Sequence, residues 1–195
     1  MKVIGLTGGI ATGKSEVTKI LRKMGISVFD ADAAVHELYQ NGIAASNLKR
    51  ICPEAIMGHE VDRQRLAALI VKQPDLLRKI EEIIHPLVRN AEHRFIAKAK
   101  ASQKTIVVID SPLLIETGHY KDMDVNVLVT TDKHNQIARA TDRPNMTKEK
   151  IELLLAKQTP TDEKRKLVDL VIENNATIEE LEVQVRVHFQ KLMDT

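Results

Sequence analysis

The sequence contains few aromatic residues and almost no cysteine. It has no tryptophan, two tyrosines and three phenylalanines, and Cys52 is its single cysteine. One cysteine excludes an internal disulfide, which favours a reducing compartment and predicts a cytoplasmic protein. So few aromatic side chains leave no platform on which bases would stack, so we expect no nucleic-acid partner.

Long apolar runs and a strong excess of one charge are also missing. The first apolar run extends only from Val3 to Leu6 before glycines interrupt it, which is too short for a secretory signal. No segment reaches the roughly 20 apolar residues of a membrane helix, so we expect no membrane partner. Lys and Arg number 29 against 27 Asp and Glu, and 43% of the residues are hydrophobic. These values are typical of one globular unit, here residues 1–195.

Predicted strands and helices alternate along much of the chain. Apolar and β-branched runs predict five buried strands, at residues 3–6, 26–29, 105–109, 125–130 and 168–172. Helical patterns occupy residues 14–24, 33–39, 132–142, 147–157 and the segment after 177. We expect Gly25 to end the first helix in a left-handed cap. The pattern predicts an α/β fold, with a five-stranded parallel sheet flanked by helices.

The middle and the end of the chain are less clear. No strong strand signal occurs between Ser46 and Ser102, where helical patterns are punctuated by prolines, so we predict a helical insertion with His85-Pro86 between two helices. The segment from 181 to 189 alternates like a strand but also fits a helical stripe. Thr177 and Glu180 have the spacing of a capping box, which favours the helix.

The residues from Gly8 to Ser15 match the pattern G-x-x-x-x-G-K-[ST]. The match falls at the predicted junction of the first strand and the first helix, where an incidental glycine-rich turn is a poor explanation. In this motif glycines let backbone N–H groups turn toward phosphate oxygens, Lys14 reaches the β and γ phosphates, and Ser15 ligates Mg²⁺. The sequence therefore predicts ATP and Mg²⁺ binding and phosphoryl transfer.

Three aspartates follow predicted strands. Asp110 is expected to hold Mg²⁺ through its water shell, and the alternative is a turn residue that accepts local N–H groups. Of Asp30 and Asp32, one should cap the helix that begins near Ala33 and the other could accept a proton from an attacking hydroxyl. Alternation along the strand would place both on the same side. We favour Asp32 as the base, and Asp30 as the cap or as a residue that contacts the ligands of Mg²⁺.

Arg139 and Arg143 lie four residues apart near the end of a predicted helix, so both can project from one face. We predict a basic lid that stabilises the transferred phosphoryl group. The alternative is two solvated arginines near acidic neighbours. His85 before Pro86 is more typical of a turn than of a site. The other histidines lack ligand spacing, so we expect no zinc.

An ordered set of motifs resembles the dephospho-CoA kinase family. These are I-G-L-T-G-G-I at 4–10, D-A-D at 30–32, H-P-L at 85–87, D-S-P-L-L-I-E at 110–116 and V-I-E-N-N at 171–175. The resemblance implies that ATP phosphorylates the 3′-hydroxyl of dephospho-CoA to give coenzyme A and ADP. It also implies a nucleotide-binding core (1–32 and 103–195), a helical substrate-binding insertion (33–102) and a lid (136–158). We expect a monomer or small homo-oligomer.

The resemblance also implies roles by position. For catalysis it implies Lys14, Asp32 and Arg143, and for the metal Ser15 and Asp110. For ATP it implies the phosphate-contacting residues Gly8, Gly9, Ala11, Thr12, Gly13, Lys14, Ser15 and Glu16, with Asn174 or Asn175 at the adenine. For the acceptor it implies Asp32, His85, Pro86, Leu113, Glu116 and Arg139.

Two residues depart from the pattern of the family, which commonly has a glycine at position 11 and a threonine at position 16. Ala11 is tolerated if its φ is negative. Glu16 puts a carboxylate in place of a hydroxyl that would meet the α phosphate, so we expect Glu16 to weaken ATP binding; the alternative is that its side chain points away from the phosphate. The alternatives are another P-loop kinase acting on a nucleotide or small alcohol, and a nucleotide-responsive switch without turnover. The N-K-x-D and D-x-x-G motifs of GTPase switches are absent, which argues against the switch.

Overall fold

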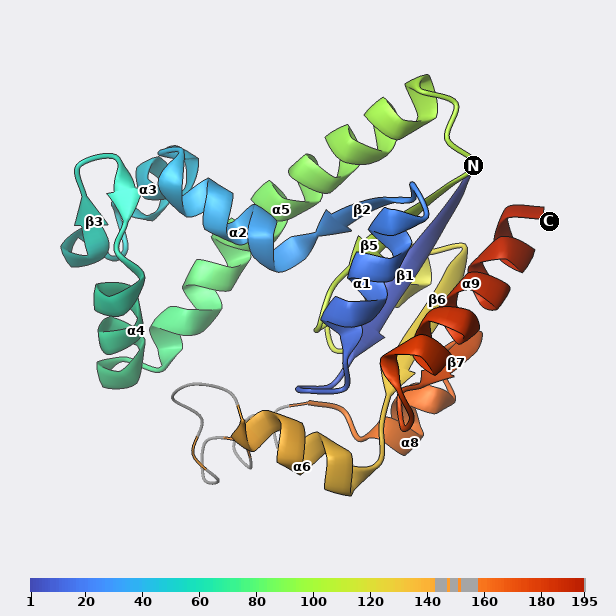
Figure 1. Cartoon of the computed structure of the whole chain (residues 1–195). Helices are drawn as coiled ribbons and strands as arrows, with labels where there is room; N and C mark the ends of the chain where they lie inside the picture. Colours follow the sequence, from blue (N-terminus) through green and yellow to red (C-terminus); the bar gives the residue numbers. More distant parts are fainter. Residues whose placement is uncertain (143–146, 148–150, 152–157, 195) are drawn as a thin grey trace. The chain divides into compact units, whose positions relative to one another are not determined.

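The computed structural model describes residues 1–142, 147, 151 and 158–194. The chain divides into two compact units (Figure 1). The first comprises Met1–Phe29 and Ala99–Thr195, and the second is Asp30–Lys98. No helix in the described part of the chain is long and apolar enough to cross a membrane.

The first unit contains a five-stranded sheet with the order β2-β5-β1-β6-β7. The strands are β1 Lys2–Gly8, β2 Ser27–Asp30, β5 Ile106–Asp110, β6 Val125–Thr130 and β7 Leu170–Glu173. The central strand β1 pairs in parallel with β5 and β6, so that Ile4 lies opposite Val108 on one side and Val125 on the other. All five residues of β5 are buried, which explains its unbroken apolar run. The predicted α/β fold is confirmed.

Helices flank this sheet: α1 Lys14–Lys23, α6 Lys133–Thr141, α8 Thr161–Arg165 and α9 Ile178–Asp194, with the short η2 His119–Asp122. Helices α1 and α9 lie side by side and share an apolar core with the strands (Figure 1). The predicted capping box opens α9, since Thr177 and Glu180 exchange two hydrogen bonds of 3.3 Å. The expected left-handed cap after α1 is also present, with φ of 79° at Gly25.

The second unit has an apolar core of its own. Its elements are α2 Ala31–Gln40, α3 Ile43–Leu48, η1 Pro53–Ala55, the strands β3 Ile56–Met57 and β4 Glu60–Val61, α4 Arg63–Lys72 and most of α5 Asp75–Ala101. The hairpin of β3 and β4 contradicts the purely helical prediction. Strands of two residues are too short to show a period in the sequence, and Gly58 takes the left-handed turn position with φ of 63°.

Helix α5 also corrects a prediction, because it runs without interruption through His85 and Pro86. A proline inside a helix costs about 3 kcal/mol through its missing N–H and its ring clash. Leu76, Ile80 and Ile84 each bury all but 3–7% of their surface on one side of this helix. Each contributes about 1.5 to 3 kcal/mol, so their burial outweighs the cost of the proline.

Candidate active site

The phosphate loop, residues Gly8–Ser15, connects the end of β1 with the start of α1 (Figure 1). Ala11 and Gly13 both have left-handed backbone conformations, with φ of 58° and 93°. Left-handed residues at alternate positions turn neighbouring N–H groups toward one side of the chain and create a concavity that attracts anions. The helix N-terminus after Gly13 adds its partial positive charge.

The condition of a negative φ, under which Ala11 would be tolerated, is not met. A left-handed conformation costs a residue with a Cβ about 1 to 2 kcal/mol, so this position carries strain. The Ala11 side chain is 4% exposed and packs in a small apolar cluster with Ala140 and Ile151, with Ile10 alongside. This packing helps to hold the strained conformation.

Two glycines of the loop have no room for a side chain. A Cβ on Gly13 would lie 2.0 Å from Nδ2 of Asn174, and one on Gly8 would lie 2.8 Å from Oγ1 of Thr12. Thr12 itself is buried, and its hydroxyl donates to the Gly9 carbonyl at 3.0 Å. The glycines of the motif are therefore required by close packing as well as by backbone conformation.

The Lys14 ammonium forms an ion pair with Oδ1 of Asp110. The other carboxylate oxygen of Asp110 accepts a hydrogen bond of 2.9 Å from Oγ1 of Thr18. Asp110 is 4% exposed, and it comes to the loop because it is the last residue of β5 and lies opposite Leu6, near the end of β1. Both carboxylate oxygens of Asp110 thus contact side chains from α1, whereas a turn residue would accept hydrogen bonds from local N–H groups.

Ser15 and Asp110 carry oxygen atoms, the ligand type that Mg²⁺ prefers, and Ser15 is exposed in the first turn of α1. The described residues contain no group of three or more His, Cys, Asp or Glu that would hold a metal on its own. A Mg²⁺ ion fits a site of this kind, because it binds through one or two protein ligands and completes its shell with phosphates and waters.

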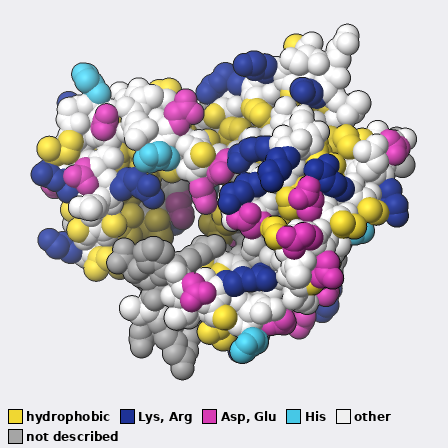
Figure 2. Space-filling view, in the orientation of Figure 1, with side chains coloured by type: hydrophobic (Ala, Val, Ile, Leu, Met, Phe, Trp, Pro, Cys, Tyr) yellow, Lys and Arg dark blue, Asp and Glu magenta, His cyan; other side chains and the backbone are white. Residues whose placement is uncertain are grey.

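Glu16 lies on the exposed side of α1. Its carboxylate pairs with the Lys19 ammonium at 2.7 Å, and the Glu16 side chain is 41% exposed. Figure 2 shows basic and acidic side chains gathered over this helix, which also carries Arg22 and Lys23 in its last turn. The negative charge of Glu16 is therefore partly offset by its neighbour.

In the second unit, Asp30 is the N-cap of α2, since its carboxylate accepts a hydrogen bond of 2.9 Å from the Ala33 N–H. The helix begins at Ala31, directly after the cap. Asp32 therefore lies in the first helical turn and not on the strand, and the expected placement of both aspartates by strand alternation is wrong. Asp32 is exposed, as are His85 and Pro86 on α5.

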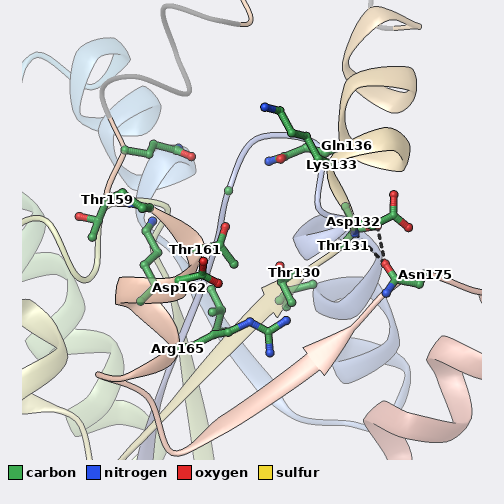
Figure 3. Close-up of a pocket in the computed structure, with 16 residues that line it drawn as sticks. Thr130, Thr131, Asp132, Lys133, Gln136, Thr159, Thr161, Asp162, Arg165 and Asn175 are labelled. Carbon is green, nitrogen blue, oxygen red and sulfur yellow. Dashed lines mark hydrogen bonds between the residues drawn. The ribbon is translucent and has the colours of Figure 1, made fainter.

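A cavity of about 810 Å³ opens in the first unit (Figure 3). Its lining includes Gly9, Thr131, Gln136, Thr159, Lys164 and Asn175. Oδ1 of Asn175 accepts hydrogen bonds from the Thr131 hydroxyl at 3.0 Å and the Asp132 N–H at 2.8 Å, shown as dashed lines in Figure 3. A cavity of this volume is typical of a small-ligand site.

The two neighbouring asparagines have different contacts. Asn174 is 7% exposed and donates from Nδ2 to the Thr12 carbonyl at 3.0 Å, in the phosphate loop. Asn175 lines the cavity and joins the end of β7 to the connection between β6 and α6. Of the two, Asn175 is the one with access to the cavity.

Glu116 is held in a buried ion pair. Its Oε1 lies 2.8 Å from the Lys164 ammonium and accepts a hydrogen bond of 2.9 Å from the Thr159 N–H. Burial raises the pKa of Glu116, but the Lys164 hydrogen bond, the N–H groups of Thr159 and of Glu116 itself, and the Lys164 charge together bring this pKa below its ordinary value. The ionised Glu116 therefore anchors the chain just before α8. Leu113, three residues earlier, is 43% exposed.

Arg139 lies in the last turn of α6, and its Nη1 atom is buried without a hydrogen-bond partner among the residues that the structure describes. Arg143 and most of the predicted lid at 136–158 lie outside the described residues.

Three residues that line the cavity were not found from the sequence. Gln136 and Gln158 both contact Ile10, and Lys164 is only 2% exposed. Isolated glutamines carry no periodic or motif signal. Lys164 lies in the polar run T-D-E-K-R, a pattern more typical of a solvated surface.

Comparisons with known proteins extend over nearly the whole chain. A family model described as dephospho-CoA kinase matches residues 2–180. A Rhodopseudomonas palustris protein named dephospho-CoA kinase is 39% identical over 186 residues, which cover 95% of this chain and 93% of that protein. A crystal structure from Thermus thermophilus has a TM-score of 0.84 at 32% identity, with 98% of this chain and 97% of that chain covered. Dephospho-CoA kinase from Campylobacter jejuni shares the fold, with a TM-score of 0.70 at 20% identity and coverage of 100% and 98%.

Proposed function

The chain belongs to the dephospho-CoA kinase family, and from this premise we propose how its residues carry out the reaction. The protein is a phosphotransferase of the last step of coenzyme A synthesis, in which ATP phosphorylates the 3′-hydroxyl of dephospho-CoA. The observation that carries this function is the family match over residues 2–180, because it includes the second unit as well as the phosphate loop. An acceptor other than dephospho-CoA is not favoured.

We propose that the N–H groups of residues 11–16 and the N-terminus of α1 bind the ATP phosphates. The long, flexible stem of Lys14 lets its ammonium move from Asp110 to the β and γ phosphates. Ser15 and Asp110 would hold Mg²⁺, which neutralises charge on these phosphates when bound. Asn175 and the adjoining cavity would receive the adenine.

For the transfer step, the 3′-hydroxyl oxygen of the acceptor forms the new bond to the γ phosphorus while the bond from that phosphorus to the bridging oxygen of ADP breaks. Asp32 takes the proton released by the hydroxyl. Arg139 and Arg143 would stabilise the charge on the transferred group. His85, Pro86, Leu113 and Glu116 belong to the proposed acceptor site.

We also propose that the enzyme works in a reducing compartment, the cytoplasm. Cys52 is free and buried, and burial raises the pKa of its thiol, with a further contribution from the charge of Glu54. A thiol in this state is structural and resists oxidation.

The decisive experiment measures ADP release with dephospho-CoA, shikimate, a nucleoside monophosphate or no acceptor. We expect turnover that depends on dephospho-CoA, and equal ADP release with and without it would refute the function.

Variants then test the roles of individual residues. Lys14→Ala should reduce kcat/KM at least as much as Asp32→Asn, because positioning and charge contribute about 7 to 11 kcal/mol whereas a general base contributes about 10² to 10⁴ in rate. Lys23→Ala, on the exposed end of α1, is the control. A milder defect in Lys14→Ala than in Asp32→Asn would count against these roles.

A further inference from the structure

We propose that Gln136 and Asn174, two side-chain amides outside the phosphate-loop motif, are positioning residues that orient loop N–H groups toward the phosphates. Each donates a hydrogen bond to a carbonyl of the loop: Gln136 to Ile10 at 2.8 Å and Asn174 to Thr12 at 3.0 Å. The inference rests on the proposed nucleotide-binding role of this loop.

The contact of Gln136 determines the orientation of one peptide unit. In a planar trans peptide the carbonyl of one residue and the N–H of the next point in opposite directions. Nε2 of Gln136 binds the Ile10 carbonyl from α6, so the N–H of Ala11 is directed away from α6. Figure 3 shows Gln136 extending from this helix toward the loop. The same contact stabilises the strained left-handed conformation of Ala11.

Asn174 acts in the same way two residues later. Its Nδ2 binds the Thr12 carbonyl from the end of β7, which directs the N–H of Gly13 to the opposite side. This contact is buried, and Gly13 accommodates it only because it lacks a Cβ. The two oriented N–H groups belong to Ala11 and Gly13, the two left-handed residues of the loop.

Gln158 also contacts the loop, but as a hydrogen-bond acceptor, whereas Gln136 and Asn174 are donors. Its Oε1 accepts a hydrogen bond of 3.3 Å from the Ile10 N–H, so Ile10 is held through both of its backbone polar groups. A Cβ on Gly9 would lie 3.1 Å from Nε2 of Gln136 and 3.3 Å from Oε1 of Gln158, so the two amides also fit closely around the preceding residue.

This arrangement is a form of preorganisation. A flexible glycine-rich loop must lose conformational entropy when it closes around phosphates, and groups that hold it in the binding conformation beforehand reduce that cost. The three amides come from α6, from the end of β7 and from the chain before α8. The loop therefore depends for its shape on segments far away in the sequence.

The test uses substitutions that keep side-chain size but change hydrogen-bonding polarity. Gln136→Glu and Asn174→Asp replace the donor with an acceptor, whereas Gln158→Glu keeps the acceptor that Ile10 needs and adds the same charge beside the same loop. Gln136→Leu removes the donor without adding a charge. Gln190→Glu, on the exposed side of α9, controls for an added charge elsewhere.

The readout is the Kd for ATP with Mg²⁺, measured by calorimetry without acceptor on the full chain, with thermal unfolding as a check of folding. We expect Gln136→Glu and Asn174→Asp to weaken binding about 10-fold to 100-fold, as for loss of an oriented hydrogen bond to a charged group. Gln136→Leu should weaken binding about 10-fold, Gln158→Glu less than Gln136→Glu, and Gln190→Glu not at all. In turnover, KM for ATP should rise while KM for dephospho-CoA stays unchanged.

Two outcomes would overturn the proposal. One is an unchanged Kd in Gln136→Glu and Gln136→Leu, and the other is an equal loss in Gln158→Glu, which would indicate a charge effect alone. If Asn174→Asp does not fold, the Gln136 variants decide the question. Failure of the proposed function would be seen separately, as ADP release by the wild type that does not depend on dephospho-CoA.

Discussion

Lys164→Met offers a test of the buried ion pair between Lys164 and Glu116. The two charged atoms lie 2.8 Å apart, and the side chains are 2% and 17% exposed. At an effective dielectric constant of about 20 their attraction is about 6 kcal/mol, most of which offsets the cost of burying the charges. Methionine fills a similar volume but leaves the Glu116 carboxylate without its cation.

Removing one partner of a buried pair costs about 3 to 5 kcal/mol. Glu116 is partly exposed and keeps the hydrogen bond from the Thr159 N–H, so we expect a loss near the lower limit, about 3 kcal/mol. For a chain of this length that loss corresponds to a fall in Tm of roughly 6 to 12 °C. Circular dichroism during heating and in urea at neutral pH measures both quantities.

A double-mutant cycle with Glu116→Gln separates the pair from its surroundings. Glutamine keeps an oxygen for the Thr159 N–H but has no charge, so the double variant should lose about 2 kcal/mol less than the sum of the single losses. Lys166→Met, an exposed lysine at the end of the same helix, should change stability by less than about 0.5 kcal/mol. Additive losses within about 0.5 kcal/mol would refute the coupling.

Three further predictions concern single residues. The pKa of Glu116 is lower in the folded protein than its ordinary value, so its stabilisation is fully present above the unfolded pKa of about 4.3 and is lost as the pH falls through the folded pKa. Urea unfolding from about pH 3 to about pH 7 should therefore show a smaller acid-side loss of stability in Glu116→Gln than in the wild type, and equal losses would contradict this role of Glu116. Ala11→Gly should change the free energy of unfolding by less than about 1 kcal/mol, because relief of left-handed strain is balanced by a lost methyl contact and a more flexible unfolded chain. Ala11→Val should lower the free energy of unfolding by at least about 2 kcal/mol in the same urea assay. Equal effects of the two substitutions would contradict a left-handed Ala11. Glu16→Thr should lower KM for ATP by up to about fivefold, which is the range expected when an exposed and partly paired charge is removed. An unchanged KM would mean that the Glu16 carboxylate does not act on the phosphates.

The elements that could be predicted are those whose signal is local. The strands β5 and β6 are rich in β-branched residues, and the phosphate loop is a contiguous motif at a strand-to-helix junction. The caps of α1 and α9 are also contiguous, since Gly25 and the Thr177 box lie beside the helices that they end or begin. In each case the physical cause and the structural effect lie within a few residues of each other.

The incorrect predictions concern features that distant contacts decide. Pro86 was expected to break a helix, but the burial of residues such as Ile80 and Ile84 keeps α5 continuous. Ala11 was expected to avoid positive φ, but Ala140 from a distant helix packs against it. Local preference amounts to a few kcal/mol, and tertiary burial of similar size can reverse it.

The sequence by itself determined the class of fold, the phosphate loop with Lys14 and Ser15, and the family through motifs spread along the chain. Only the tertiary structure decided which residues support that loop. Asp110, Gln136, Gln158 and Asn174 reach it from four separate places in the chain, and all are side chains whose contacts depend on sheet order and helix position. The motif describes the groups that face the ligand, whereas Gln136 and Gln158, which support the loop from behind, are brought there by the fold and leave no local pattern.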